Sequence, residues 1–163
     1  MLCRGALSLP GIKLSTFWDR ITHYKREEWK YDPDKVDARL VQLVDEFTEY
    51  VKAEYGKKAF GVIHVAWEAD GHTADSQHYA GLAVDLHFAG VSLLDQFLTA
   101  TRFPFTGIGV YPYWNNPGLH LDCRVLTDTN MGARWWRDRD GQYKALDSKW
   151  FALMTTQGSK DIG

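Results

Sequence analysis

Residues 76–88 read SQHYAGLAVDLHF and join a short polar loop to an alternating segment. From Gly81 onward the apolar side chains recur at every second residue, a pattern typical of a strand with one buried face. Asp85 falls on the face opposite the apolar set, in a segment otherwise suited to burial. A carboxylate in such a place requires a charge partner or a metal, because an unpaired buried charge is unfavourable. We therefore expect a strand that begins shortly after His78 and carries Asp85 as a functional side chain.

Residues 119–125, LHLDCRV, alternate in the same way. His120 and Asp122 share one face, whereas Cys123 lies with the apolar residues and is expected to be a buried thiol. A polar face of this kind is also common on a solvated sheet surface. Two histidines and one aspartate suit a divalent ion with one position left for water, the pattern of a catalytic zinc site. The sequence thus predicts that His78, Asp85 and His120 converge on one zinc ion per chain.

The segment before this region predicts one helix and one strand. Asp32-Pro33-Asp34 is typical of a helix start, since carboxylates favour a helix N-terminus and proline is tolerated in its first turn. Apolar residues at helical spacing extend this helix to about residue 54, with Gly56 as its C-cap. Residues 59–67 are rich in β-branched and aromatic residues and predict a buried strand, and residues 68–77 predict a loop.

The second half of the chain predicts a helix over residues 92–101, an irregular strand within 103–113 and a turn over 114–118. A hairpin is expected from residue 132, with Asp140-Gly141 as a two-residue turn. Residues 153–163 read as a polar tail. The inward-facing residues predicted for the helix at 92–101 are Leu93, Leu94, Phe97 and Leu98.

These elements predict the α+β class: one small domain over residues 1–163, with a mostly antiparallel sheet and flanking helices. The length of 163 residues suits one core, and the 45% apolar and 25% charged composition is that of a globular protein. Seven tryptophans and eight tyrosines are many for this length. They are explained either by core and rim packing or by an aromatic-lined groove.

Charge and hydropathy exclude several classes of partner. With a formal net charge of −2, the chain lacks the excess of positive charge that indicates nucleic-acid binding. No window approaches the roughly 20 apolar residues of a membrane span, so no membrane insertion is expected. The apolar run near the N-terminus is broken by Pro10 and is a poor secretory signal, so synthesis in the cytoplasm is expected. Cys3 and Cys123 do not form a disulfide framework, and no pattern specifies an oligomeric state.

The motif Ser-x-His-x-x-Gly-x-Ala-x-Asp, from Ser76 to Asp85, resembles the signature of the zinc D-Ala-D-Ala carboxypeptidase family. The His-x-Asp at His120, the GIGVY at residues 107–111 and the Ala-Arg-Trp at residues 133–135 resemble one bacterial and phage branch of that family. The resemblance covers roughly residues 13–136. It implies the small α+β domain shared with hedgehog signalling domains and lysostaphin-type peptidases, with zinc held by the three residues predicted above.

The sequence departs from this family at two places. Relatives commonly carry a general base as a Glu or a His shortly before the last zinc histidine, where this chain has Pro117 and Gly118. Asp122, on the face of His120, becomes the candidate catalytic base, and its alternative role is to orient the imidazole. Glu68 stands where relatives often have an Arg for a substrate carboxylate. This change favours an endopeptidase over a strict carboxypeptidase, and Glu68 is a second candidate base.

Further roles follow from neighbouring positions. His87 and Arg124 are candidates for stabilising an oxyanion or for a structural role, and His64 is expected to be structural. Gly81 and Ala83 are expected to leave room around the metal. Candidate residues for a peptide groove are Tyr113 and Trp114.

The function predicted by the resemblance is hydrolysis of an amide bond in peptidoglycan stem or cross-link peptides, in cell-wall remodelling or phage lysis. The site of action is then the cell wall, the periplasm or a phage particle. The alternative is a zinc-containing binding or structural module without catalysis.

Overall fold

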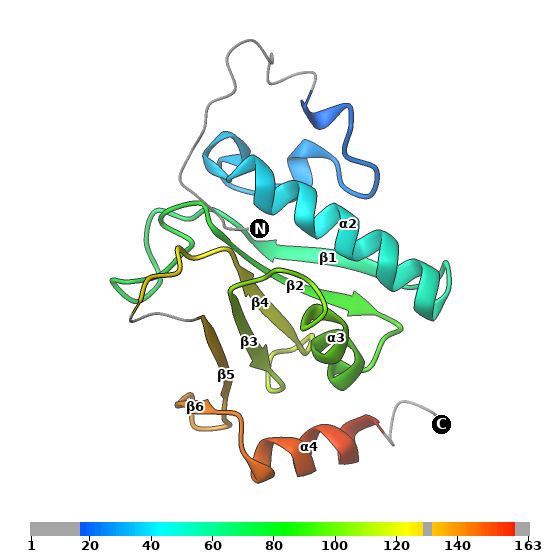
Figure 1. Cartoon of the computed structure of the whole chain (residues 1–163), viewed down its shortest axis with the longest axis vertical. Coiled ribbons are helices and arrows are strands. Elements are labelled where there is room, and N and C mark those ends of the chain that lie inside the picture. Colours follow the sequence, from blue (N-terminus) through cyan, green and yellow to red (C-terminus); the bar gives the residue numbers. More distant parts are fainter. Residues whose placement is uncertain (1–16, 129–131, 159–163) are drawn as a thin grey trace.

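A computed structural model describes residues 17–128 and 132–158 (Figure 1). Its centre is a six-stranded sheet with the strand order β1-β2-β4-β3-β5-β6. The strands are β1 (Phe60–Val65), β2 (Ala83–Ala89), β3 (Gly107–Tyr111), β4 (Gly118–Asp122), β5 (Ala133–Arg137) and β6 (Tyr143–Ala145). Neighbouring strands are antiparallel, except that β3 and β5 are parallel. The predicted α+β class with a mostly antiparallel sheet is confirmed.

The α-helices bounded within the described residues are α2 (Ala38–Tyr55), α3 (Leu93–Ala100) and α4 (Ser148–Gly158). Figure 1 shows α2 beside β1 at one end of the sheet, α3 next to the middle strands, and α4 at the other end near β6. Short 3-10 turns, η1 (Arg26–Trp29) and η2 (Pro33–Lys35), precede α2. Among the described residues, no helix has the length and apolar character that a membrane crossing requires.

The alternation predicted for β2 and β4 separates the core from the opposite face of the sheet. Val84 and Leu86 on β2, with Leu119 and Leu121 on β4, are fully buried in one hydrophobic core with residues of the three helices. Asp85 and His120 point the other way. They are paired across the two strands, so the register brings their side chains side by side.

Strand β3 separates the same two faces with smaller residues. Ile108 is fully buried in the core, whereas Gly107 and Gly109 lie on the face of His120. A Cβ atom at Gly107 would lie 2.0 Å from Oδ2 of Asp122, and one at Gly109 would lie 2.5 Å from the Trp135 ring. The two glycines therefore create the space that the Asp122 and Trp135 side chains occupy on the sheet face that carries His120.

Helix α2 begins later than predicted and ends as predicted. The Asp32 carboxylate accepts a hydrogen bond from the Asp34 amide and caps η2, after which the chain becomes extended again. Asp37 then caps α2 through the Arg39 amide. At the other end Gly56 has φ +94°, a conformation that favours glycine.

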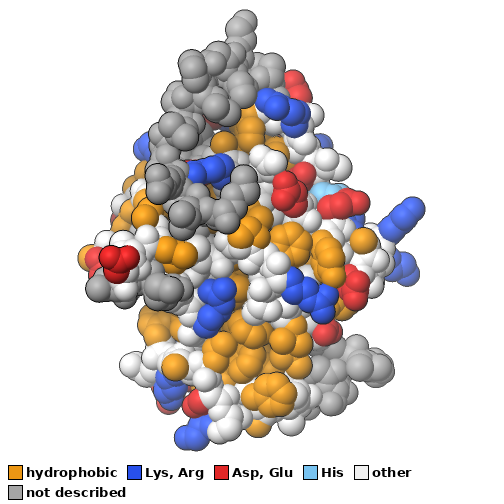
Figure 2. Space-filling model, in the orientation of Figure 1, with side chains coloured by type: hydrophobic (Ala, Val, Ile, Leu, Met, Phe, Trp, Pro, Cys, Tyr) orange, Lys and Arg blue, Asp and Glu red, His pale blue; other side chains and the backbone are white. Residues whose placement is uncertain are grey.

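One inward-facing residue predicted for α3 is wrong. Ser92 caps the helix as its N-cap, but Leu98 is 46% exposed. Gln96 is buried instead, and its side-chain amide bonds the backbone of Phe88 and Val91. These bonds tie the end of β2 to α3 and thereby decide which helix face is inward. Figure 2 shows hydrophobic side chains gathered on the surface over α3 and α4.

The C-terminal segment differs from prediction in two ways. The hairpin is present, but its turn has three residues between the hydrogen-bonded pair Asp138 and Gln142, with Gly141 at φ +79°. The polar tail is wrong for residues 153–158, which belong to α4. In this helix Trp150 packs edge-on against Phe97 of α3, with the ring centroids 4.9 Å apart. Residues 159–163 lie outside the described residues.

Smaller predictions have mixed outcomes. Cys123 is buried as expected, whereas Cys3 lies outside the described residues. The strand predicted within 103–113 is β3, at residues 107–111, and the strand predicted over 119–125 ends earlier, at Asp122. The tryptophans serve both predicted purposes, since some belong to the core and others line a cleft.

Candidate metal centre

His78 is held in one orientation by the loop that leads into β2. Its Nδ1 lies 2.5 Å from the carbonyl oxygen of Ala66, and a carbonyl oxygen only accepts hydrogen bonds. Nδ1 therefore donates this hydrogen bond, and Nε2 is the ring nitrogen that faces Asp85 and His120. The residue is 1% exposed, so this orientation is fixed by packing as well.

Gly81 is needed for the backbone and not, as expected, for space around a metal. It has φ +68°, and a Cβ atom there would lie 1.9 Å from the carbonyl oxygen of Lys35. The tight turn that it allows connects the end of the His78 loop to β2. Ala83 is paired with Asp122 across the strands and lies two residues before Asp85 on the same face of β2.

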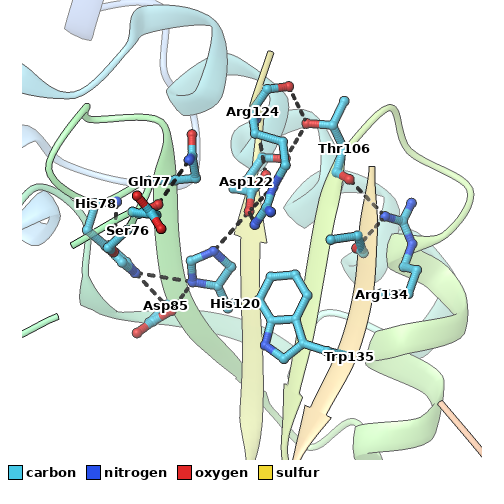
Figure 3. A network of polar contacts seen from close by, with 12 residues as sticks. Ser76, Gln77, His78, Asp85, Thr106, His120, Asp122, Arg124, Arg134 and Trp135 are labelled. Carbon is cyan, nitrogen blue, oxygen red and sulfur yellow. Dashed lines mark hydrogen bonds and ion pairs between the residues drawn. The ribbon is translucent and has the colours of Figure 1, made fainter. Parts of the chain in front are cut away.

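The three predicted ligands lie together (Figure 3). His78 Nε2 is 3.2 Å from His120 Nδ1 and 3.3 Å from Asp85 Oδ1, and these last two atoms are 2.9 Å apart. Atoms bound to one tetrahedral zinc ion at about 2.0–2.2 Å are separated by roughly 3.3–3.6 Å. Small movements of these side chains would therefore allow one ion to contact all three.

Asp122 lies at one edge of the His120 ring, beside Nε2, whereas His78 and Asp85 lie at the opposite edge, beside Nδ1. Its Oδ2 is 3.1 Å from Nε2 of His120, and its Oδ1 accepts a hydrogen bond of 2.9 Å from Nε of Arg124. The Asp122 side chain is fully buried. A carboxylate behind a metal-binding imidazole fixes the tautomer and the orientation of the ring. This geometry corresponds to the orienting role that the sequence left open for Asp122.

The charges within this cluster compensate one another. Burial alone would raise the pKa of Asp85, but hydrogen bonds with His120 and His78 hold it well below the usual range. Burial likewise opposes ionisation of Asp122, and His120 with Arg124 lowers its pKa strongly. Burial disfavours a charged His120, yet Asp122 and Asp85 raise its pKa to about 9. Without a metal, an imidazolium at His120 thus neutralises part of the charge of two carboxylates.

The ligand atoms open into a cleft of about 710 Å³. One wall comes from the loop before β2, including His72 and Gln77. The opposite wall is aromatic and comes from Tyr111, Trp135 and other residues of β3, β5 and β6. Pockets of this size commonly bind small molecules or short peptide segments.

The aromatic wall is built by ring contacts. Tyr111 stacks on Trp114 with ring centroids 4.1 Å apart, and its hydroxyl accepts a hydrogen bond of 3.4 Å from Nε1 of Trp135. Trp135 lies 5.3 Å from the His120 ring. Trp114 lines the cleft as predicted, whereas Tyr113 does not and contacts Arg139 instead.

Sequence reasoning missed Tyr111, although its position was readable. The alternation in GIGVY places Tyr111 on the same face as Gly107 and Gly109, once that face is known to contact His120. For Trp135 the sequence indicated only a place in the Ala-Arg-Trp motif of the family resemblance, and not its position in the cleft.

His72 is a second residue of the cleft that the sequence did not suggest. Its ring is stacked on that of His78, with centroids 4.4 Å apart and planes 10° apart. The Glu68 carboxylate contacts Nε2 of His72 at 2.8 Å, and Tyr79 bonds the His72 backbone. Glu68 itself is not among the residues that line the cleft. The signal for His72 was its spacing of four residues from Glu68 in a polar loop.

The remaining predicted residues differ in their distance from the cleft. His87 does not line it, and its Nδ1 lies 2.7 Å from Nε2 of His64 in a stacked pair. Burial lowers the pKa of both imidazoles. Arg124 does line the cleft, with its guanidinium 5.2 Å from the Trp135 ring. Of the two oxyanion candidates, only Arg124 therefore faces the space beside the ligands.

No family model matches the sequence, and a search of curated proteins finds no match either. The interpretation of the site therefore depends on its geometry and on the motifs quoted above.

Proposed function

We propose that this protein is a zinc-dependent peptidase that hydrolyses an amide bond in stem or cross-link peptides of peptidoglycan. The observation that carries the proposal is the convergence of Nε2 of His78, Oδ1 of Asp85 and Nδ1 of His120 at one side of an open cleft. The choice of substrate is supported by the resemblance of residues 76–85 to the zinc D-Ala-D-Ala carboxypeptidase signature.

The donor set favours zinc over other common ions. Two imidazole nitrogens and one carboxylate oxygen match zinc sites with three protein ligands, whereas magnesium and calcium prefer oxygen ligands. The second ring nitrogen of each histidine already has an acceptor, the Ala66 carbonyl for His78 and Asp122 for His120. Such support behind the ligands is typical of metal-binding histidines.

A bound zinc ion supplies two effects, a lower pKa of bound water and polarisation of the scissile carbonyl. The chain supplies orientation. Asp122 holds the His120 ring, Arg124 compensates the charge of Asp122, and the Ala66 carbonyl holds His78. Arg124 also reaches the cleft beside Trp135, where a positive charge stabilises a developing oxyanion.

Endopeptidase activity suits the cleft better than removal of a terminal residue. The cleft is open along the candidate ligands, so it can take an extended chain. Glu68, at the position where relatives often have an arginine, is bound to His72. The arginine that often holds a terminal substrate carboxylate in relatives is therefore missing at this position.

A second function, a zinc-containing binding or structural module without catalysis, is favoured by one observation. Both carboxylates considered as general base already have partners: Asp122 is buried against Arg124 and His120, and Glu68 contacts His72. Asp122 in particular is a weak base, because its partners hold its pKa low. A phage particle component with this domain would bind zinc for stability or recognition.

One experiment separates the two functions. Purified protein is analysed for zinc and incubated with purified sacculi, and newly released amino groups are measured. The matched variants are His120→Ala, which removes a ligand, and His64→Ala, which removes a histidine outside the ligand set. Zinc near one per chain with amine release by the wild type and His64→Ala supports the peptidase. Zinc without amine release supports the module, and wild-type protein that binds no zinc contradicts both.

A further inference from the structure

At the end of the cleft away from the candidate ligands lies a cation that has no carboxylate partner among the described residues. Arg137 of β5 lines the cleft, and its Nε donates a hydrogen bond of 3.1 Å to the carbonyl oxygen of Gly141. Its guanidinium also lies 5.7 Å from the centre of the Tyr143 ring. Within residues 17–128 and 132–158, no carboxylate forms an ion pair with Arg137.

The other arginines of this region are already engaged. Arg124 donates to Asp122 through Nε and Nη2, which fixes much of its guanidinium. Arg134 is one strand position from Trp135 on the opposite side of β5, and it donates to the carbonyl oxygens of Phe105 and Thr106. Arg137 is therefore the cleft arginine with donors to offer a bound anion.

A continuous aromatic surface connects the ligands to Arg137. Trp135 lies beside His120, donates to the Tyr111 hydroxyl and stands in the same row across the sheet as Asp85 and His120. Tyr111 is in turn in edge contact with Tyr143, at 6.4 Å between ring centroids. Arg137 packs on Tyr143, so the guanidinium lies at the outer end of this wall.

The register gives the length of the wall. His120 and Trp135 are separated by one intervening strand, and Arg137 is two residues further along β5. With about 4.8 Å between strands and 3.3 Å per residue, the Cα atoms of His120 and Arg137 are roughly 12 Å apart. Three to four extended peptide residues span this distance.

We propose that Arg137 binds a carboxylate of the peptide substrate, three to four residues from the bond at the metal ligands. The wall of Tyr111, Trp135 and Tyr143 packs against the peptide between these two points. Guanidinium groups bind carboxylates through two parallel hydrogen bonds, which adds geometric selectivity to charge. This inference rests on the proposed function, because it takes the substrate of the site to be a peptide.

The test uses two synthetic peptidoglycan stem pentapeptides that differ at one group. In one the α-carboxylate of the γ-linked D-glutamate is free, and in the other it is an amide. Binding is measured by calorimetry on the zinc-free chain, so that neither peptide is hydrolysed. We expect the wild type to bind the free acid about tenfold more tightly than the amide, and Arg137→Gln to reduce this ratio to about one.

Two control variants sharpen the result. Arg137→Lys keeps the charge but loses the paired hydrogen bonds, so an intermediate ratio is expected. Arg134→Gln removes the same charge from the same strand outside the cleft, and the tenfold ratio should persist. A ratio that falls equally in Arg134→Gln and Arg137→Gln would mean that only the general charge of β5 matters, which overturns the assignment.

The outcomes also distinguish this inference from the proposed function. Equal binding of the two peptides by the wild type overturns the role of Arg137, and so does failure of both peptides to bind. Hydrolysis of sacculi by the zinc-loaded protein is measured separately and decides the proposed function. A peptidase that cleaves sacculi yet ignores the carboxylate keeps its function and loses this specificity.

Discussion

At the scale of single residues, His120 is the most constrained group of the site. Each of its ring nitrogens faces a carboxylate, with Asp85 at 2.9 Å from Nδ1 and Asp122 at 3.1 Å from Nε2. In the metal-free protein the protonated ring donates one hydrogen bond to each carboxylate. A metal at Nδ1 replaces one proton, while the other proton stays between Nε2 and Asp122. Metal binding and proton binding therefore compete at one atom.

This competition predicts a pH-dependent zinc affinity. The pKa of His120 is raised to about 9, so its ring is protonated below that pH and must release a proton to bind zinc. We expect the apparent affinity to rise about tenfold per pH unit from pH 7 to pH 8.5. The measurement is competition with a chromophoric chelator across this range. An affinity that stays constant over the range would show that His120 is neutral before zinc binds.

Asp122→Asn tests the role of this buried carboxylate. If Asp122 orients His120, the variant should bind zinc about 10- to 100-fold more weakly, because outer partners of metal ligands have effects of this size. A general base would instead leave zinc affinity intact and reduce turnover alone. Zinc affinity and amine release are measured on the same preparation. Asp138→Asn is a suitable control, since Asp138 pairs with Lys144 in the hairpin outside the cleft.

At the scale of elements, β3 shows how one strand serves the core and the site at once. Its larger residues Ile108 and Val110 face the core, while Gly107 and Gly109 leave room for Asp122 and Trp135. The strand can thus lie next to β4 without displacing the groups behind and beside His120. Substitutions on its two faces should have separable effects.

The pair Gly107→Ala and Ile108→Val tests this separation. The methyl group at residue 107 meets the Asp122 carboxylate, so we expect about 1–3 kcal/mol lower stability together with weaker zinc binding. Ile108→Val removes one methylene from the core and should lower stability by about 0.5–1.5 kcal/mol without changing zinc affinity. Urea unfolding and zinc titration measure both quantities. Unchanged zinc affinity in Gly107→Ala would contradict the proposed link between residue 107 and the ligands.

At the scale of the whole molecule, the sheet separates a hydrophobic core from the candidate metal ligands. The helices pack on one face, and the ligands from a loop and two strands meet on the other. Because the three ligands come from separate parts of the chain, an ion that binds all of them stabilises the folded arrangement and not the unfolded chain. Zinc should therefore act as a stabilising ligand of the fold.

Thermal unfolding tests this expectation. At a free zinc concentration of 100 times Kd, binding adds about 2.7 kcal/mol to the free energy of unfolding. For a chain of this size the midpoint should rise by roughly 5–10 °C. A chelator should reverse the rise, and His78→Ala should show little of it. An equal rise in His78→Ala would indicate that zinc binds elsewhere.

The sequence alone determined the parts of the protein that depend on local period and local chemistry. Alternation in residues 82–88 and 119–123 placed Asp85 and His120 on the polar faces of two strands, and the motif around His78 supplied the third ligand. The α+β class could be predicted in the same way, because helical and strand segments differ in the period of their apolar residues. Side-chain direction along a strand repeats every two residues and can be read without knowing the neighbouring strands.

Only the tertiary structure decided what surrounds these ligands. The partners of Asp122, the stacking of His72 on His78 and the position of Arg137 depend on strand order and loop path, which no local pattern encodes. The predictions of a buried Leu98 and of a polar tail at residues 153–158 were wrong for the same reason, since contacts with distant residues override local preference there. The candidate metal ligands are thus set by short-range periodicity, whereas the cleft beside them is set by long-range packing.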